Sequence, residues 1–358
     1  MASIVFIGDS HLGYRHRFKS QRLRDYSKAF EEAVRKALNL KPTFMVFTGD
    51  LLHHPKPDPV SMRTVLKKLL EAASQCQVIV CIGNHEIEGH LGTTYSPIYS
   101  EVHDRIHVLS SENPHVLLNV GRKTYGFHGF EYTRNRERAE EKLRGLSSNL
   151  EGDVNILCLH QAIERYLSPY EISLAALREV APNYDLIVSG HVHKHQPIKE
   201  LMEVKPAYYC GSTERISFNE ADNRNGFLCF EDDLHSPRFI KVESAPMSSV
   251  RFEFKGSPEE LNNRLEGVIN SHNVPLLRVD VDADLQGDLL DVRRDWTTFE
   301  HGRTILDVNV VPRSREFELE FERVELSEDL IREYFEKSGN GNKELEELCV
   351  DLFQRYAA

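Results

Sequence analysis

The stretch Ser3-Ile4-Val5-Phe6-Ile7-Gly8-Asp9-Ser10-His11 sets an apolar run directly before an aspartate and a histidine. Four later apolar runs end in the same way, in clusters of aspartate, asparagine or histidine: Gly49-Asp50-Leu51-Leu52-His53, Gly83-Asn84-His85-Glu86, Leu159-His160-Gln161 and Gly190-His191-Val192-His193. This repetition indicates that five strand ends deliver polar side chains to one place.

The apolar runs alternate with helical patterns, which is typical of a layered α/β domain. Short runs rich in Val, Ile, Leu and Phe predict buried strands at 3–7, 43–48, 77–82, 154–159, 186–189, 207–210 and 226–230. Amphipathic spacing predicts helices at 24–40 and 59–74. In open α/β sheets ligands bind beyond the carboxyl ends of the strands, which is where all five clusters lie. We expect this domain to close near residue 245.

The five clusters contain the ligands of a two-metal phosphoesterase centre. Phosphodiester hydrolysis requires an activated water and neutralised phosphoryl charge, and two divalent ions about 3.5–4 Å apart can supply both. Asp50 is the natural bridging ligand, because it ends the second strand between the flanking clusters. The remaining ligands divide into two expected sets: Asp9, His11 and His193 for one ion, and Asn84, His160 and His191 for the other. Such mixed ligands favour Mn²⁺, Fe²⁺ or Zn²⁺ over Ca²⁺.

Two further histidines are candidates for catalysis. His85 follows Asn84, and an imidazole there can donate a proton to the phosphate or to the leaving oxygen. His53 lies three residues past Asp50 and is expected to orient the phosphate. An isolated Asp-x-His or His-x-His is more often structural than metal-bound, but five clusters in this order favour the metal centre.

Composition and length indicate a globular chain. With 358 residues, 40% hydrophobic and 28% charged, there is room for one large domain and a smaller one. Since no apolar run approaches the roughly 20 residues of a membrane helix and no signal peptide is evident, we expect a cytoplasmic protein without a membrane partner. Scattered cysteines without CxxC spacing predict buried free thiols: Cys76, Cys81, Cys158, Cys210, Cys229 and Cys349.

The net charge of −12 is unevenly distributed. Residues 251–358 hold 14 Lys and Arg against 25 Asp and Glu, so the first 250 residues are nearly neutral. A local basic patch there can still bind a phosphate backbone. The candidate patch directly follows the first cluster and comprises Arg15, Arg17, Lys19, Arg22 and Arg24. The alternative is that these residues form an ordinary solvated helix face.

The last third of the chain predicts two smaller units. Strands at 249–254, 276–281 and 305–310, with a helix from about 258 to 271, indicate a second α/β unit. Two short amphipathic helices follow, separated by Ser338-Gly339-Asn340-Gly341, with Ser327 as N-cap of the first. Helices this short are marginal alone, so their apolar faces must dock on this chain or on a partner. The partner-binding candidates are Leu330, Tyr334, Leu345, Leu348, Leu352 and Phe353.

The five clusters resemble those of the calcineurin-like metallophosphoesterases, and three details resemble the DNA-repair nuclease branch of the SbcD and meiotic-recombination-eleven type. These details are Asp9-Ser10-His11-Leu12-Gly13-Tyr14, the histidine at position 53, and Tyr209-Cys210-Gly211-Ser212-Thr213-Glu214-Arg215. The resemblance covers roughly residues 3–230. It implies a β-sandwich flanked by helices, and a nuclease with two Mn²⁺ ions per subunit that trims double-stranded ends and cuts single strands or hairpins.

The resemblance also implies an organisation and partners. A nuclease domain would span 1–245, a capping domain that contacts DNA 246–322, and a helix-loop-helix 323–358 that grips an SMC-like ABC-type coiled-coil ATPase. The helix at 59–74 would form a homodimer contact. The absence of a long basic tail favours a prokaryotic, archaeal-like and nucleoid-associated protein.

Two alternatives remain open. A phosphoesterase of the same superfamily would act on nucleotides or other small phosphate esters. A DNA-end-binding scaffold would use the metal site mainly for structure and would serve to tether the ATPase.

Overall fold

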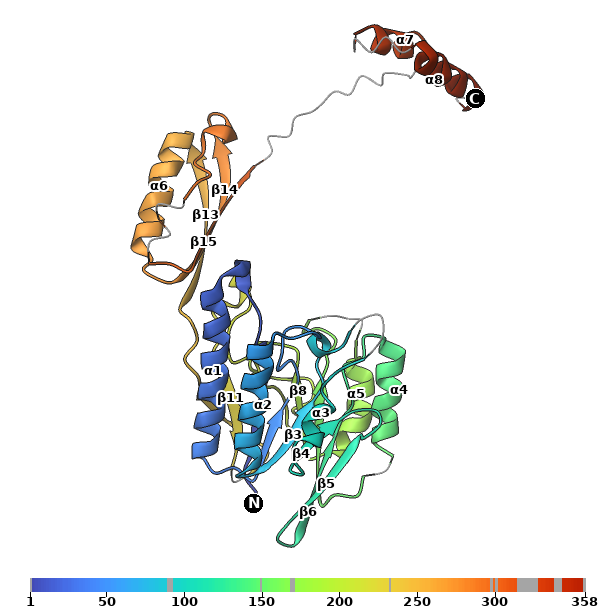
Figure 1. The fold of residues 1–358 in the computed structure, drawn as a ribbon, viewed down its shortest axis with the longest axis vertical. Coiled ribbons are helices and arrows are strands. Elements are labelled where there is room, and N and C mark those ends of the chain that lie inside the picture. Colours follow the sequence, from blue (N-terminus) through green and yellow to red (C-terminus); the bar gives the residue numbers. More distant parts are fainter. Residues whose placement is uncertain are drawn as a thin grey trace. The chain divides into compact units, whose positions relative to one another are not determined.

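The computed structural model describes residues 2–88, 93–148, 150–167, 171–231, 233–296, 299, 302–313, 328–337 and 343–356 (Figure 1). The strands are β1 Ile4–Ile7, β2 Phe44–Phe47, β3 Gln77–Cys81, β4 Ile106–Leu109, β5 His115–Val120, β6 Lys123–His128, β7 Val154–His160, β8 Leu186–Gly190, β9 Gln196–Pro197, β10 Ala207–Tyr209, β11 Gly226–Phe230, β12 Arg238–Lys241, β13 Met247–Gly256, β14 Leu276–Leu285 and β15 Ile305–Pro312. The α-helices are α1 Ser20–Asn39, α2 Pro59–Ala73, α3 Ile98–Glu101, α4 Arg136–Leu146, α5 Leu174–Val180, α6 Pro258–Ser271, α7 Glu328–Lys337 and α8 Lys343–Tyr356. The 3-10 turns are η1 His16–Phe18, η2 Asn84–Glu86, η3 Ala181–Asn183, η4 Phe218–Glu220 and η5 Leu289–Asp291.

Two six-stranded mixed sheets form the main body. The first has the order β12-β11-β1-β2-β3-β4, and β1 to β4 run parallel. The second has the order β5-β6-β7-β8-β10-β9, and β6, β7, β8 and β10 run parallel. Parallel strands end at the same edge of a sheet, so the loops after β1, β2 and β3 are neighbours, as are those after β7 and β8.

Helices cover the outer face of each sheet, which confirms the predicted layered α/β sandwich. One core lies between the first sheet and α1 and α2, a second between the two sheets, and a third between the second sheet and α4 and α5. Strands in the middle of such a stack are apolar on both faces, and β1, β2 and β8 are buried at every residue.

Free cysteines occupy this interior. Cys81, Cys158 and Cys210 lie in the core between the two sheets, and Cys76 and Cys229 lie in the core under α1 and α2. Cys349, on α8, is partly exposed. The prediction of free, mostly buried thiols is confirmed.

The expected second α/β unit is a three-stranded parallel sheet, β13-β14-β15, with α6 packed on one face. A small cluster joins it to the main body, with Phe218 packed against Leu276 and Ile305. Contacts divide the chain into two compact units, Met1–Pro312 and Arg313–Ala358. The finer boundary at residue 245 and the start of the last domain at 323 stay predictions.

The unit Arg313–Ala358 contains α7 and α8, which contact each other through a salt bridge from Arg332 to Glu346. Among the side chains of this pair that the structure describes, Phe335 and Val350 are the buried hydrophobic ones. The predicted N-cap Ser327 and the linker 338–341 lie outside the described residues. None of the helices in the described part of the chain is long and apolar enough to cross a membrane.

Candidate metal centre

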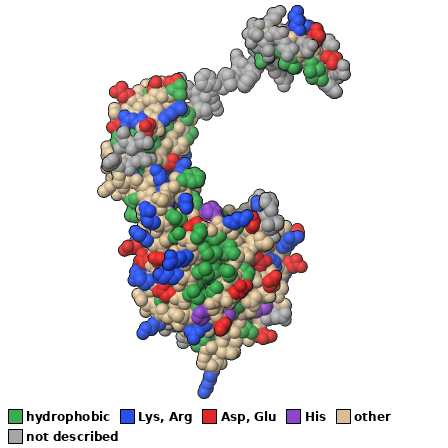
Figure 2. Space-filling view, in the orientation of Figure 1, with side chains coloured by type: hydrophobic (Ala, Val, Ile, Leu, Met, Phe, Trp, Pro, Cys, Tyr) green, Lys and Arg blue, Asp and Glu red, His purple; other side chains and the backbone are tan. Residues whose placement is uncertain are grey.

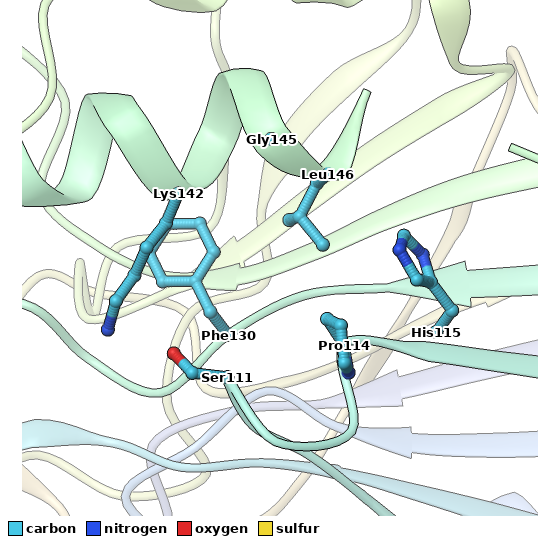
Figure 3. A pocket seen from close by; sticks show the side chains of 7 residues that line it. All are labelled: Ser111, Pro114, His115, Phe130, Lys142, Gly145 and Leu146. Atoms are coloured by element: carbon cyan, nitrogen blue, oxygen red, sulfur yellow. The ribbon is translucent and has the colours of Figure 1, made fainter. Parts of the chain in front are cut away.

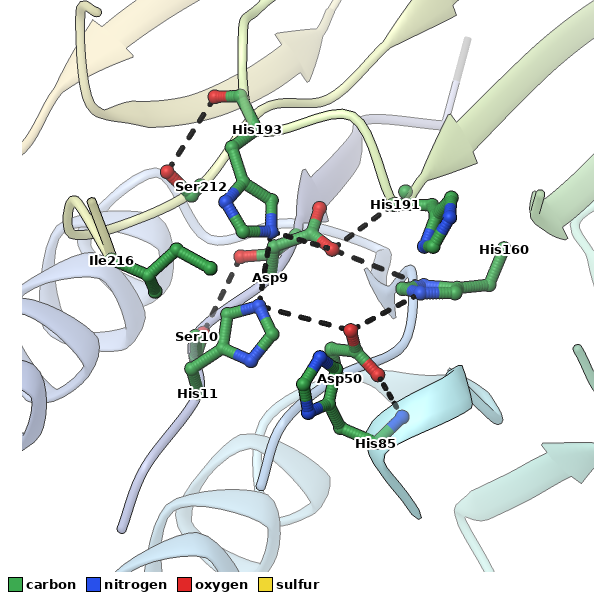
Figure 4. Close-up of polar contacts among 12 residues, drawn as sticks. Asp9, Ser10, His11, Asp50, His85, His160, His191, His193, Ser212 and Ile216 are labelled. Carbon is green, nitrogen blue, oxygen red and sulfur yellow. Dashed lines mark hydrogen bonds and ion pairs between the residues drawn. The ribbon is translucent and has the colours of Figure 1, made fainter. Parts of the chain in front are cut away.

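The ends of five strands and the loops that follow them bring all seven predicted ligands together. Figure 4 labels six of these side chains, all except Asn84. Asp9, His11 and His193 form one group whose ligand atoms lie within 4.8 Å of one another. Nε2 of His11 lies 3.0 Å from Nε2 of His193 and 3.7 Å from Oδ2 of Asp50. This group matches the set expected for the first ion.

The second group contains Asp50, His160 and His191, again within 4.8 Å. Nε2 of His160 lies 3.3 Å from Oδ2 of Asp50 and 3.1 Å from Oδ1 of Asn84. Asp50 therefore lies beside histidines of both groups, as a bridging ligand must. That these side chains hold metal ions stays a prediction, and the geometry is the one it requires.

Backbone conformation aims these side chains inward. Four predicted ligands have a positive φ, which is uncommon outside glycine: Asp9, His11, Asp50 and His191, at 35°, 47°, 50° and 78°. The preceding glycines allow close approach. A Cβ on Gly49, whose φ is +97°, would collide with the His160 ring, and a Cβ on Gly83 would collide with the Asp50 carboxylate.

Charge is tightly coupled in the centre. Burial alone would raise the pKa of Asp50, but the adjacent His160 imidazole holds it well below its usual range. Conversely, burial lowers the pKa of His160, but Asp50 outweighs this effect and raises it to about 10. The two side chains thus form a buried ion pair in which the imidazole carries a proton. Since a histidine must be neutral to bind a metal ion, a divalent cation would replace that proton.

The donor set fits divalent metals. Oδ2 of Asp9 is buried and accepts no hydrogen bond from any residue that the structure describes. An uncompensated buried carboxylate oxygen is costly, and a cation would compensate it. Nδ1 of His160 donates to the carbonyl oxygen of Thr48 at 2.7 Å, which leaves Nε2 free to act as the ligand. The residues of a dimetal site are present, with imidazole, carboxylate and amide donors and no thiolate.

His85 and His53 lie beside the first group. Their rings stack with centroids 4.4 Å apart, and each ring lies about 5 Å from that of His11. The backbone N–H of His85 donates to Oδ1 of Asp50 at 2.9 Å, and its Nδ1 donates to the carbonyl oxygen of His53 at 2.9 Å. These two hydrogen bonds fix His85 beside the bridging carboxylate and leave its Nε2 unused by either contact.

Three acidic residues that the sequence did not single out orient the centre. Oε1 of Glu220 lies 3.0 Å from Nδ1 of His193, and Oε1 of Glu171 lies 3.3 Å from Nε2 of His191. Glu86 is fully buried and accepts hydrogen bonds from the N–H groups of Gly83 and Leu51, which ties two ligand loops together. No sequence signal predicts the first two contacts, whereas the position of Glu86 two residues after Asn84 was a usable hint.

The predicted basic patch is only partly exposed. Arg15, Arg17 and Arg24 are exposed, and Lys19 is intermediate. The prediction is wrong for Arg22, whose side chain is fully buried and donates to the carbonyl oxygen of Arg215 at 2.7 Å. Arg22 also contacts Glu214, so it joins α1 to the loop before η4 and is not available to DNA phosphates.

The chain also matches a known protein family, and the match agrees with this geometry. Residues 2–195 match the model of the family described as calcineurin-like phosphoesterase. The chain belongs to the calcineurin-like phosphoesterase family. The matched residues include every predicted ligand, whereas the two sheets continue beyond them with β9 to β12.

Relatives of this phosphoesterase are described as DNA double-strand break repair protein Mre11. The protein from Methanocaldococcus jannaschii is 29% identical over 73% of this chain and 72% of its own length. The one from Haloferax volcanii is 27% identical over 72% of this chain and 56% of its own length. Among solved structures, a dimetal phosphatase from Danio rerio has 11% identity and a TM-score of 0.47, covering 68% of this chain and 98% of that one.

Proposed function

We propose that this chain is a Mn²⁺-dependent DNA nuclease that processes ends in double-strand-break repair, as a double-strand exonuclease and a single-strand or hairpin endonuclease. The observation that supports this proposal most is the similarity of the chain to Mre11 proteins. In this chain the seven candidate ligands also converge beside His53 and His85. When bound, two divalent ions would supply the Lewis acidity that activates water and neutralises phosphoryl charge.

The chain's own residues divide the remaining work. Because Nδ1 of His85 donates to the carbonyl oxygen of His53, Nε2 would carry the second proton of the protonated ring and give it to the leaving oxygen, which returns the imidazole to its neutral form. His53 supports this ring through its carbonyl oxygen and by stacking, and would also orient the phosphate. Glu220 and Glu171 would hold His193 and His191 in their ligating orientations.

DNA would approach along the exposed Arg15, Arg17 and Arg24 and the partly exposed Lys19. The open face of the three-stranded sheet is a poor DNA surface, because its Glu253, Asp280, Asp282, Asp284 and Asp307 outnumber Arg251, Lys255 and Arg278. Any DNA contact by the proposed capping domain, 246–322, would therefore use its other surfaces.

Exposed apolar side chains support the proposed homodimer. Val60 and Leu70 on α2, with Ile98 on α3 and Val102 beside it, expose between 39% and 65% of their surface. Figure 2 shows hydrophobic side chains gathered over this part of the main body. A patch of this kind is typical of a protein interface, which favours α2 and α3 as the contact between subunits.

The helix pair α7 and α8 would bind the coiled-coil ATPase. Tyr334, Leu345, Leu348 and Leu352 are exposed on α7 and α8, while Leu330 and Phe353 are half-buried. An apolar face on a short helix pair is what docking on a coiled coil requires. An archaeal-like, cytoplasmic and nucleoid-associated setting belongs to the same proposal.

The decisive experiment compares the wild type with Asp50→Ala and His85→Ser on end-labelled duplex, single-stranded and hairpin DNA in Mn²⁺, Mg²⁺ or chelator. We expect Mn²⁺-dependent cleavage that both substitutions abolish, while His85→Ser keeps its bound manganese. Loss of metal from His85→Ser would instead make His85 a ligand. Intact DNA together with rapid hydrolysis of a generic phosphodiester would favour a small phosphate ester as substrate.

A scaffold function would have a different signature. Deleting residues 326–358 would then remove the biological role, whereas the nuclease substitutions would have little effect in cells. If deletion leaves ATPase association unchanged, the assignment of α7 and α8 is wrong.

A further inference from the structure

Phe18 exposes 93% of its side chain, more than any other large hydrophobic residue that the structure describes. It ends η1, the turn between the first metal cluster and α1. Burial of an aromatic ring is a main source of stability in a folded chain, so a ring left in water contributes almost nothing to this fold.

The backbone at this point also opposes stability. Arg17 and Phe18 have φ values of 53° and 58°, two consecutive residues in the left-handed region. That region suits glycine or asparagine and disfavours bulky side chains. An outlier of this kind near a reactive centre is a reason to look for a function.

The base of the turn is fixed against the candidate metal centre. The Tyr14 ring lies 4.1 Å from that of His53, and the buried His16 ring lies 5.4 Å from that of Phe218. Phe218 begins η4, which also contains Glu220, the partner of His193. Within the turn, the N–H of Phe18 donates to the carbonyl oxygen of Arg15 at 2.8 Å. The turn that carries the exposed ring is therefore anchored beside the phosphoesterase centre.

Cations flank the ring in sequence. Arg15 and Arg17 precede it and are exposed, with Arg17 in an ion pair with Asp307, and Lys19 follows it. An aromatic ring among cations is the arrangement by which proteins bind single-stranded nucleic acid, because bases stack on the ring while phosphates lie near the charges. Such stacking tolerates any base, since every base has a π face.

We propose that Phe18 is a stacking platform for an unpaired nucleobase of the DNA strand whose phosphodiester enters the metal centre. This inference rests on the proposed nuclease function and specifies its substrate. DNA with a frayed end, a single-stranded overhang or a hairpin loop offers such a base, and a blunt end held shut does not. Aromatic side chains that insert at base steps act by the same physics.

The test uses the full chain and DNA with 2-aminopurine at the terminal nucleotide, in EDTA so that binding is measured without hydrolysis. Four proteins are compared: wild type, Phe18→Trp, Phe18→Leu and Phe18→Asn. Wild type and Phe18→Trp should quench the fluorescence of a frayed end. Phe18→Leu and Phe18→Asn should lose the quench and bind overhangs about tenfold more weakly, with unchanged binding to a duplex whose end is crosslinked.

Stability separates a functional ring from a structural one. Asparagine tolerates the left-handed conformation, so Phe18→Asn should melt at the same temperature as the wild type or higher. In Mn²⁺, all variants should hydrolyse a generic small phosphodiester at the wild-type rate. A lower melting temperature for Phe18→Asn would overturn the inference, because the ring would then be a structural element.

The remaining outcomes are distinguishable. If Phe18→Leu and Phe18→Asn keep the quench and the affinity, Phe18 is not the platform, although the nuclease proposal stands. If Phe18→Leu loses only its association with a partner protein, the ring serves protein docking and the inference fails. If the wild type neither binds nor cuts DNA yet hydrolyses the small phosphodiester, the proposed function fails first.

Discussion

Individual ligands of the candidate centre combine predictable chemistry with unpredictable conformation. Asp9, Asp50 and His191 could be identified from sequence, because each follows an apolar run and has a metal-binding side chain. Their left-handed backbone could not, because nothing in an Asp or His residue specifies a positive φ. The contacts of Glu220 and Glu171 were equally hidden, since they join residues 20 or more positions apart.

Gly83→Ala should impair metal binding. The new Cβ would collide with both the carboxylate and the backbone nitrogen of Asp50, so the loop that carries this ligand must shift away from His160. We expect at least about tenfold weaker Mn²⁺ binding, the scale seen when support for metal ligands is disturbed. Isothermal titration of Mn²⁺ measures the effect.

Gly145→Ala is the matched control, because the added Cβ meets nothing within 4 Å on α4. It should leave Mn²⁺ affinity unchanged and stabilise the fold by about 0.5–1 kcal/mol. Equal affinities for the two variants would mean that the glycine at position 83 has no role in placing Asp50.

His128 should make the fold sensitive to mild acid. Burial lowers its pKa to about 4. Its Nε2 donates to Oδ1 of Asn155 at 2.9 Å, so the neutral Nδ1 accepts from His115, which lines the cavity in Figure 3. The unfolded chain binds this proton near its ordinary pKa of 6.5, so stability is complete above that pH and falls as the pH drops toward 4. Between pH 7 and pH 5 the loss should be about 2 kcal/mol.

Urea denaturation of the wild type and His128→Gln at both pH values measures this contribution, with EDTA present to remove metal effects. The variant should be less stable at pH 7 but should lose less on acidification. An identical pH dependence in the two proteins would show that His128 is not the group responsible.

At the scale of elements, strand ends were predictable and helix starts were less so. β1, β2, β3, β7 and β8 end within two residues of the expected positions, since apolar runs stop where the polar clusters begin. α1 begins at Ser20, four residues before the predicted start at Arg24. The sequence gives no sign of this earlier start, because the N-cap residue is Lys19, whose side chain makes no capping hydrogen bond. The α6 boundaries agree with the expectation, and there Ser257 and Glu260 form a capping box.

An ion pair links the turn before α1 to the three-stranded sheet, from Nη2 of Arg17 to Oδ2 of Asp307 at 2.7 Å. Arg17, which is predicted to bind a DNA phosphate, is thus held by the carboxylate of Asp307 on β15. Asp307→Asn should release Arg17, tighten DNA binding two- to fivefold at low salt, and steepen its log–log salt dependence by about one unit. Fluorescence anisotropy over a salt series gives both quantities.

Asp284→Asn removes the same charge from the same sheet face, where Asp284 pairs with Lys255. It should alter DNA binding much less. If both variants bind DNA equally well, the effect is one of net charge and not of Arg17.

At the scale of the molecule, the centre joins two sheets. Asp9, Asp50 and Asn84 follow strands of the first sheet, whereas His160, His191 and His193 end or follow strands of the second. The sequence predicted that these loops converge, because all of them follow strand ends. It did not predict the strands β4 to β6, although β5 and β6 pair across a two-residue turn. It also did not predict the cluster joining Phe218 to Leu276 and Ile305, because that cluster depends on contacts between distant segments.

Metal binding should therefore stabilise the whole main body. Ions that bind only the folded arrangement raise the free energy of unfolding by about 2.7 kcal/mol at a concentration of 100 times Kd. Adding Mn²⁺ should raise the melting temperature, and EDTA should reverse the change. Asp50→Ala should remove the shift, and a shift that persists in Asp50→Ala would place the stabilising ion elsewhere.

The buried free thiols between the two sheets can report local unfolding of the protein. Cys81, Cys158 and Cys210 are sealed from solvent, whereas Cys349 on α8 is within reach of a reagent. A thiol dye would label Cys349 first, and would label the buried thiols, including Cys76 and Cys229 under α1 and α2, only when local unfolding exposes them. The difference in labelling rate between Cys349 and each buried thiol would measure how often the sandwich opens locally, without any engineered probe.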